Sequence, residues 1–240
     1  MKLIKAFFKG WNAFEIILLL LGLTLPAVVA LVIGGGILEV LSSTLSITVV
    51  LLVAKGKLEG YFLCLVSMAF YTAVCWRNAV YGEVILMLVF QYPIILFGIR
   101  SWLKNKRTDT QKGRVVIVNK VSKREIAVII TSQAAMAAGY FFVLRALGTE
   151  QLIVSTILFA WSIVATYLFM RRSHLNLAAF FINDIIAITL WALIIAGGTT
   201  SAAAVLVMPA MYLLNDGYGI YMWRKLRHNQ TKNQESEVKV

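Results

Sequence analysis

The sequence predicts an all-α polytopic membrane protein with eight transmembrane helices. Three observations support this fold class: the apolar composition, the length of the apolar segments and the one-sided distribution of basic residues. Of the 240 residues, 60% are hydrophobic and 14% are charged, and the mean hydropathy is +0.81. Soluble domains typically carry about 25% charged residues, so the composition excludes an ordinary soluble domain.

Eight segments are long enough to cross a bilayer. A hydrocarbon core about 30 Å thick needs about 20 mostly apolar residues in a helix. Segments of this kind run over 12–33, 36–54, 58–76, 81–103, 125–146, 151–170, 175–196 and 201–223. The first exceeds the apolar region of a signal peptide and lacks a convincing cleavage site, so we expect it to be retained as a span.

The basic residues test both the number of helices and their orientation. With the N-terminus in the cytoplasm, all 23 Lys and Arg residues except Arg77 and Arg145 fall in cytoplasmic segments. One helix more or fewer would destroy this separation, because every later loop would change sides. We therefore expect a multi-pass protein of the cell inner (plasma) membrane with both termini cytoplasmic. The net charge of +12 then faces anionic lipid, and no nucleic acid partner is expected.

Short sequence echoes indicate an internal repeat. The stretch FGIRSWLK at 97–104 returns as YGIYMWRK at 218–225, a displacement of 121 positions, and Ser46 with its following Ile returns at Ser162, a displacement of 116. Both copies of the longer stretch fall at cytoplasmic helix ends. Three helices carry the chain across the membrane, so a second triplet with the same orientation requires one extra crossing, which 125–146 supplies. The result is a 3+1+3 parallel repeat with an extra N-terminal helix.

The domain organisation follows from this repeat. An extra transmembrane helix occupies 1–35, the first three-helix repeat 36–104, a cytoplasmic connection and linker helix 105–147, the second repeat 148–225, and a disordered cytoplasmic tail 226–240. The tail is expected to be disordered because it has few apolar residues to bury. Parallel repeats are a transporter architecture, with the substrate site near the midplane between them. A duplication that only packs a bundle is the alternative.

Two stretches carry a family resemblance. YGEVILMLVFQYPIILFGIRSWLK (81–104) resembles the Tyr-Gly-Glu to Trp pattern of the PnuC-type nicotinamide riboside transporters, and LFMRRSHLNLAAFFINDI (168–185) is similar to their basic pair followed by a polar helix centred on Asn. The resemblance covers 36 to 228. It implies a SWEET-like fold and facilitated uptake by alternating access without ATP hydrolysis, in agreement with the absence of a P-loop motif.

The chain departs from the family pattern where substrate is expected to bind. Asn176 and Ala179 stand where the family has a Trp pair, and Met87 stands where a polar residue is usual. A deoxynucleoside or thiamine therefore remains an alternative substrate, and a non-transport membrane scaffold or receptor an alternative role. The resemblance implies a small-molecule substrate, the lipid bilayer and a cytosolic kinase as functional partner. A homo-oligomer stays open, and no cofactor or metal is expected.

Polar side chains at mid-membrane depth are costly unless they face protein or a water-filled cavity, so they are candidates for substrate contact. Asn183 is the first candidate, because its amide can hold ribose hydroxyls or a carboxamide. The alternative is an interhelical hydrogen bond. Trp191 lies about 12 Å along the same helix, at about 1.5 Å per residue, which suits one small ligand.

Other candidates come from the remaining helices. Trp161 could face the permanent pyridinium charge of nicotinamide riboside, an attraction of about 2 kcal/mol when desolvated; packing against lipid or core is the alternative. Gln91 matches Tyr212 by the repeat displacement, so the two are expected to face each other. Thr48 either lines the pathway or bonds its own helix backbone. The predicted substrate-binding residues are Asn183, Trp161, Gln91, Tyr92, Tyr212, Asn215, Trp191 and Thr48.

The acidic residues receive separate predictions. Asp184 points about 100° away from Asn183 on a helix, so it suits a pair with another helix as well as a substrate contact. Asp184 and Asp216 are the candidates if transport is coupled to an ion. No motif of an intramembrane enzyme accompanies them, so the chain is not expected to be an enzyme. Glu15 lies near a helix end and is expected to reach interface water.

Overall fold

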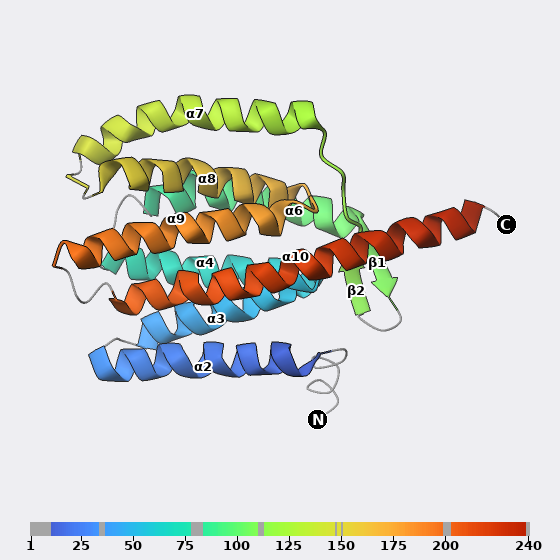
Figure 1. Cartoon of the computed structure of the whole chain (residues 1–240), viewed down its shortest axis with the longest axis horizontal. Helices are drawn as coiled ribbons and strands as arrows, with labels where there is room; N and C mark the ends of the chain where they lie inside the picture. The colour runs from blue at the N-terminus through green and yellow to red at the C-terminus, as the bar shows by residue number, and fades with distance from the viewer. Residues whose placement is uncertain are drawn as a thin grey trace.

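The computed structural model describes residues 11–33, 37–77, 84–109, 113–146, 148–149, 151–198 and 203–238. In these ranges the chain is almost entirely helical (Figure 1). The elements are α2 (Ala13–Ile33), α3 (Ile37–Ala54), α4 (Leu58–Arg77), the π-helix η1 (Leu86–Gln91), α6 (Tyr92–Lys104), β1 (Lys106–Asp109), β2 (Gly113–Val116), α7 (Lys123–Ala146), α8 (Leu152–Met170), α9 (Asn176–Ala196) and α10 (Ala203–Val238). Because η1 runs directly into α6, the described residues form eight helical segments, and the predicted number is confirmed.

Several helices have the length and composition needed to cross a membrane. Among the described residues, four meet both conditions on their own: Leu86–Lys104, Lys123–Ala146, Leu152–Met170 and Asn176–Ala196. Shorter apolar stretches occupy Ala13–Val29, Val40–Ala54 and Leu58–Ala73. Large apolar side chains also cover the outer faces, as in Phe97 and Ile153, which are 73% and 68% exposed. A helix satisfies its own backbone hydrogen bonds, so these apolar faces suit a lipid surround.

The helices pack as two units with one flanking helix each. In the first unit α3 packs on α4 and α4 on α6, and in the second unit α8 packs on α9 and α9 on α10. The units meet where α3 contacts α10 and where α6 contacts α8. α2 packs against α3 and α7 packs against α8, and the two flanking helices run along opposite edges of the bundle (Figure 1). The extra N-terminal helix α2 therefore packs on the first helix of the first unit, and the linker helix α7 packs in the same way on the first helix of the second unit.

The same backbone turn ends the first helix of each unit. The turns occupy 52–57 and 168–173, and their left-handed residues are Gly56, with φ 66°, and Arg172, with φ 57°. In each turn the N–H of this residue donates to the carbonyl three residues earlier in the chain. The N–H of the next residue donates to the carbonyl five residues before it, and all four hydrogen bonds are 2.8 to 3.0 Å long. This Schellman pattern satisfies the last carbonyls of a helix. Positions 56 and 172 have the same displacement as Ser46 and Ser162.

Arg172 adopts a conformation that favours glycine, at a cost of about 1–2 kcal/mol for an L-residue. Its Nη1 donates to the Ile117 carbonyl at 3.0 Å, and the Asn119 N–H donates to the Arg172 carbonyl at 2.9 Å. The arginine therefore anchors the connection that leads into α7. This connection was predicted only as a cytoplasmic stretch; it contains an antiparallel hairpin in which Lys106 pairs with Val116.

The C-terminal end differs from the prediction. A disordered tail was predicted over 226–240, whereas α10 continues as a helix to Val238 and extends beyond the rest of the bundle (Figure 1). No Gly or Pro follows Gly219. Once a helix is nucleated, each added residue gains one hydrogen bond, so a polar sequence can continue it without a core of its own.

Candidate functional site

Each unit contains a polar side-chain pair that joins its first and second helices. In the first unit the Ser46 and Ser67 hydroxyls lie 2.7 Å apart. In the second, the Ser162 hydroxyl donates to Asn183 Oδ1 at 2.8 Å. The displacement of 116 that relates Ser46 to Ser162 also relates Ser67 to Asn183. Asn183 is therefore the second-unit counterpart of a serine and keeps its amide nitrogen available beyond this bond.

Trp161 lies on the same contact between α8 and α9. Its indole Nε1 donates to the Ala179 carbonyl at 2.8 Å, one helical turn before Asn183. The side chain is partly buried. The hydrogen bond fixes the orientation of the indole ring beside the polar pair of the second unit.

A second polar group connects α10 to α3. Asn215 is 1% exposed, and its Nδ2 donates to the Val50 carbonyl at 3.2 Å and to Asp216 Oδ1 at 3.1 Å. The Tyr212 hydroxyl hydrogen-bonds the Ser46 side chain. The third helix of the second unit is thus attached through polar side chains to the first helix of the first unit.

Tyr92 and Tyr212 approach the same residue from different units. Tyr92 hydrogen-bonds Thr72 and lies close to Cys64 of α4, and Tyr212 also lies close to Cys64. Cys64 is a free thiol. The sequence predicted Gln91 opposite Tyr212; among the described contacts, Tyr92 rather than Gln91 shares a neighbour with Tyr212.

The remaining predicted residues lie outside these contacts. Thr48 donates to the Thr44 carbonyl of its own helix at 3.0 Å, which is the alternative that the sequence left open. Gln91 ends the π-helix η1, just before Pro93, whose missing N–H interrupts the regular hydrogen-bond ladder. Trp191 is partly buried on α9. Within the described residues, no group of three His, Cys, Asp or Glu side chains could hold a metal ion.

An aromatic plug fills the bundle at the end where α3, α6 and α8 finish and where α10 leaves the bundle (Figure 1). We define it as Tyr61, Trp102, Phe169 and Trp223. The Tyr61 ring lies 4.8 Å from Trp102 and 4.5 Å from Phe169, and Trp102 lies 6.3 Å from Trp223. Tyr61 and both Trp side chains are 0% exposed. This end carries the basic turns of the chain and is filled by side chains.

The plug also links the two units symmetrically. Trp102 Nε1 donates to the Phe169 carbonyl at 3.2 Å, and Trp223 Nε1 donates to the Val53 carbonyl at 2.9 Å. The displacement from 102 to 223 is that of the longer sequence echo, and the displacement from 53 to 169 is that of the serines. Each unit therefore caps the first helix of the other.

We expect Trp223→Phe and Trp102→Phe each to lower the melting temperature of the purified protein in detergent. Each variant keeps an aromatic ring but removes one of the two donors to a buried carbonyl, which retains the N–H of its own turn; the loss of one such hydrogen bond costs about 0.5–1.5 kcal/mol. Trp76→Phe is the matched control, because Trp76 is 64% exposed. Melting curves that coincide for all three variants would contradict this role of the indole N–H groups.

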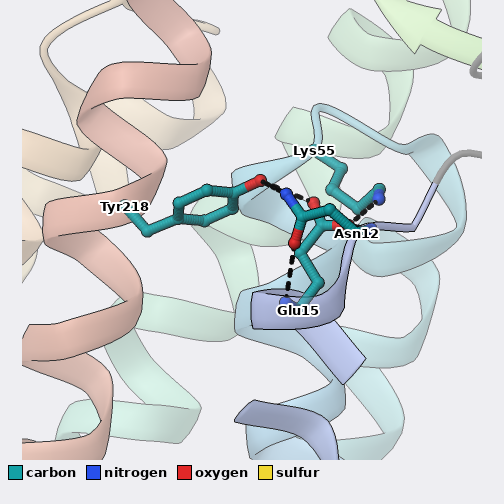
Figure 2. A network of polar contacts seen from close by, with 4 residues as sticks. All are labelled: Asn12, Glu15, Lys55 and Tyr218. Carbon is teal, nitrogen blue, oxygen red and sulfur yellow. Dashed lines mark hydrogen bonds and ion pairs between the residues drawn. The ribbon is translucent and has the colours of Figure 1, made fainter. Parts of the chain in front are cut away.

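A buried ion pair attaches α2 to the first unit. Glu15 Oε2 lies 2.5 Å from Lys55 Nζ, and both side chains are 1% exposed. The Tyr218 hydroxyl donates to Glu15 Oε1 at 2.9 Å, and Asn12 Nδ2 donates to the Tyr218 oxygen at 2.8 Å. Figure 2 shows Glu15 with Lys55 on one side and Tyr218 on the other. The expectation that Glu15 reaches interface water is wrong, because α3 and α10 cover it.

A more exposed ion pair attaches α7 to the second unit. Arg171 Nε lies 2.6 Å from Glu125 Oε1, with side chains 39% and 25% exposed, and Tyr167 donates to the same oxygen at 2.7 Å. The hydrogen bond to Glu125 raises the pKa of Arg171. In the first unit, burial lowers the pKa of Lys57, which Glu59 and Glu15 partly offset. The sequence contains a signal that could have identified Glu15. Each flanking helix has a glutamate in its first turn, Glu15 in α2 and Glu125 in α7. A basic residue, Lys55 or Arg171, directly follows the first helix of each unit.

Comparisons with known proteins cover nearly the whole chain. A sequence profile described as "Nicotinamide mononucleotide transporter" matches residues 36–225. A protein from Neisseria mucosa named "Nicotinamide riboside transporter PnuC" is 28% identical over 228 residues, which is 94% of this chain and 87% of that protein. A protein of the same name from Haemophilus influenzae is 25% identical over 225 residues, 94% of this chain and 96% of that protein.

The fold is likewise shared with a solved structure. The crystal structure of the vitamin B3 transporter PnuC superposes with a TM-score of 0.80 at 27% identity, covering 95% of this chain and 97% of that one. The predicted all-α membrane fold and the predicted family are both confirmed. Since the profile alone matches most of the chain, this protein belongs to the nicotinamide mononucleotide transporter family, of PnuC type, and is a multi-pass membrane transporter rather than an enzyme.

Proposed function

We propose that this protein carries nicotinamide riboside into the cell by alternating access, without ATP hydrolysis. The observation that carries the proposal is the similarity, over 94% of the chain, to two proteins named as nicotinamide riboside transporters. The geometry supports it, because polar side chains of both units gather in the interior behind a closed aromatic plug. A ligand held there needs only a change in the contact between the units to reach the other side.

The proposed roles follow the contacts. Asn183, fixed by Ser162, hydrogen-bonds the ribose hydroxyls or the carboxamide, while the Trp161 ring, fixed by Ala179, lies against the pyridinium. Tyr92, Tyr212 and Asn215 complete the polar surface between the units. Gln91, Trp191 and Thr48 are weaker candidates, because their known contacts do not join this group.

The proposed direction of transport rests on charge. The plug lies at the end that carries Lys55, Arg171 and Arg224, and basic loops face the cytoplasm in membrane proteins. We infer that both termini are cytoplasmic and that this structure is closed on the cytoplasmic side. Opening the plug would then release the substrate inside. Net uptake follows the gradient, which a cytosolic kinase maintains by phosphorylating the product.

A thermal-shift panel on the purified protein tests the substrate. We expect nicotinamide riboside to raise the melting temperature, and thiamine and deoxynucleosides to leave it unchanged. Asn183→Ala and Trp161→Ala should weaken binding about tenfold or more, which corresponds to about 1.4 kcal/mol per tenfold. Thr189→Ala is the control on the same helix, because this exposed hydroxyl bonds its own backbone at Ile185.

Two results would replace the proposal. Stabilisation by thiamine or a deoxynucleoside alone would assign the site to that substrate. Binding of nicotinamide riboside without uptake into liposomes that contain only this protein would favour a receptor or scaffold.

A further inference from the structure

Two carboxylates lie together inside the bundle. Asp184 of α9 and Asp216 of α10 are 4% and 3% exposed, and they are close enough for their charges to act on each other. The helices touch beside them, because a Cβ on Gly217 would lie 3.6 Å from the Phe181 ring. Asn183 bonds α8, and the next side chain along a helix points about 100° away, so Asp184 is directed to a different neighbour, α10.

The surroundings of this pair hold no compensating cation in the described part of the chain. Neither carboxylate has a Lys or Arg ion-pair partner there; the recorded pairs, Glu15–Lys55 and Glu125–Arg171, use other acids. Among the described residues, Tyr212 of α10 lies close enough for both carboxylates to act on it, and Tyr212 in turn neighbours Cys64 of α4 and Ser46 of α3. Charged carboxylates inside a membrane protein are costly without a partner, so these two are either protonated or neutralised by a positive charge that a ligand brings.

Two polar atoms at this location also lack partners. Asp184 Oδ2 and Asn215 Oδ1 are buried and make no hydrogen bond within the described structure. Asn215 is 1% exposed, and its Nδ2 is bonded to Asp216 Oδ1, so its free oxygen lies beside the carboxylates. Both unused atoms are acceptors. Buried acceptors without donors are unfavourable, and together with the carboxylates they suit a ligand that brings positive charge.

We propose that Asp184 and Asp216 supply the counter-charge for a cationic organic substrate and make the transporter select it over a neutral analogue of the same shape. The inference rests on the proposed function and deepens it. In that function Asn183 holds the polar part of the ligand, and Asp184 is its neighbour in the chain. Nicotinamide riboside carries a fixed positive charge on its ring. Its dihydro form differs by one added hydride, has nearly the same shape and is neutral.

Binding of these two ligands to the purified full-length protein tests the proposal. We expect the wild-type protein to bind the cation at least tenfold more tightly than the dihydro form. Asp184→Asn and Asp216→Asn should weaken binding of the cation at least tenfold while changing that of the neutral form less than twofold. Asp184→Glu should restore the preference. Glu59→Gln, which removes an exposed carboxylate in the first turn of α4, should leave the preference unchanged.

Several results would overturn the proposal. One is a wild-type protein that binds the cation no more tightly than the dihydro form. This outcome is measured without any variant, so it does not depend on whether a variant folds. Another is an equal loss of affinity for both ligands in the Asn variants, which would indicate that the carboxylates only position other groups of the site. A third is binding that requires Na⁺ and fails when choline replaces it, because the carboxylates would then hold an inorganic cation. If neither form binds but thiamine does, the proposed substrate fails, and the same variants tested with cationic thiamine still decide the role of the carboxylates.

Discussion

Lys55→Met is expected to lower the free energy of unfolding by about 3–5 kcal/mol, because it leaves the Glu15 carboxylate buried without its cation. Both side chains are 1% exposed, so water cannot replace the lost partner. Tyr218 still donates to Glu15, but a neutral donor does not neutralise the charge. The effect is measured by denaturant or thermal unfolding of the purified protein in detergent.

The second unit provides the matched control. Arg171→Met removes the corresponding partner of Glu125, but these side chains are 39% and 25% exposed, and an exposed ion pair contributes only about 0–1 kcal/mol. Removing the acid together with the base, in Glu15→Gln with Lys55→Met, should recover much of the loss in the first unit. Equal losses for Lys55→Met and Arg171→Met would show that burial does not govern the two pairs.

Gly98→Ala is expected to abolish folding or to leave a poorly stable protein. A Cβ at this position would lie 1.5 Å from the Tyr61 hydroxyl oxygen. Tyr61 cannot move aside, because it is 0% exposed and packs between Trp102 and Phe169. Overpacking a well-filled core typically costs about 1–3 kcal/mol, and a clash with an immobile ring should exceed that range. The measurements are the yield of monodisperse protein and its melting temperature.

Two further glycines calibrate this prediction. Gly139→Ala on α7 should be tolerated, because nothing lies within 4 Å of the added carbon. The melting temperature of Gly219→Ala should lie between those of the other two variants. The added carbon would lie 2.5 Å from the end of the Leu177 side chain, which can rotate more easily than a stacked ring. A melting temperature for Gly98→Ala close to that of Gly139→Ala would mean that the plug is loosely packed.

The apolar pattern and the basic residues were sufficient to predict eight helices, and the short sequence echoes predicted the repeat. Each helix satisfies its own backbone hydrogen bonds, so a span depends mainly on the residues within it. The echo between 97–104 and 218–225 also indicated correctly that these ends are equivalent, because Trp102 and Trp223 make matching bonds. The hairpin and the long C-terminal helix were missed, since polar segments outside the bilayer carry no comparable local signal.

The candidate site was harder to predict than the fold. A polar residue in a helix can face lipid, its own backbone or the interior, and only the packing of other helices decides among them. Thr48 bonds its own backbone, whereas Asn183 and Asn215 bond neighbouring helices. The sequence named all three as candidates and could not decide between substrate contact and the alternatives.

The number and order of the helices, their duplication and the family could be read from the sequence alone. The burial of Glu15 against Lys55 and Tyr218, 40 and 203 residues away in the chain, depends on how the helices pack. The proximity of Asp184 and Asp216 depends on the same packing. The physical reason is the range of the interactions. Helix formation in a membrane is governed by neighbours in the chain, whereas neutralising a buried charge depends on groups that folding brings from distant segments.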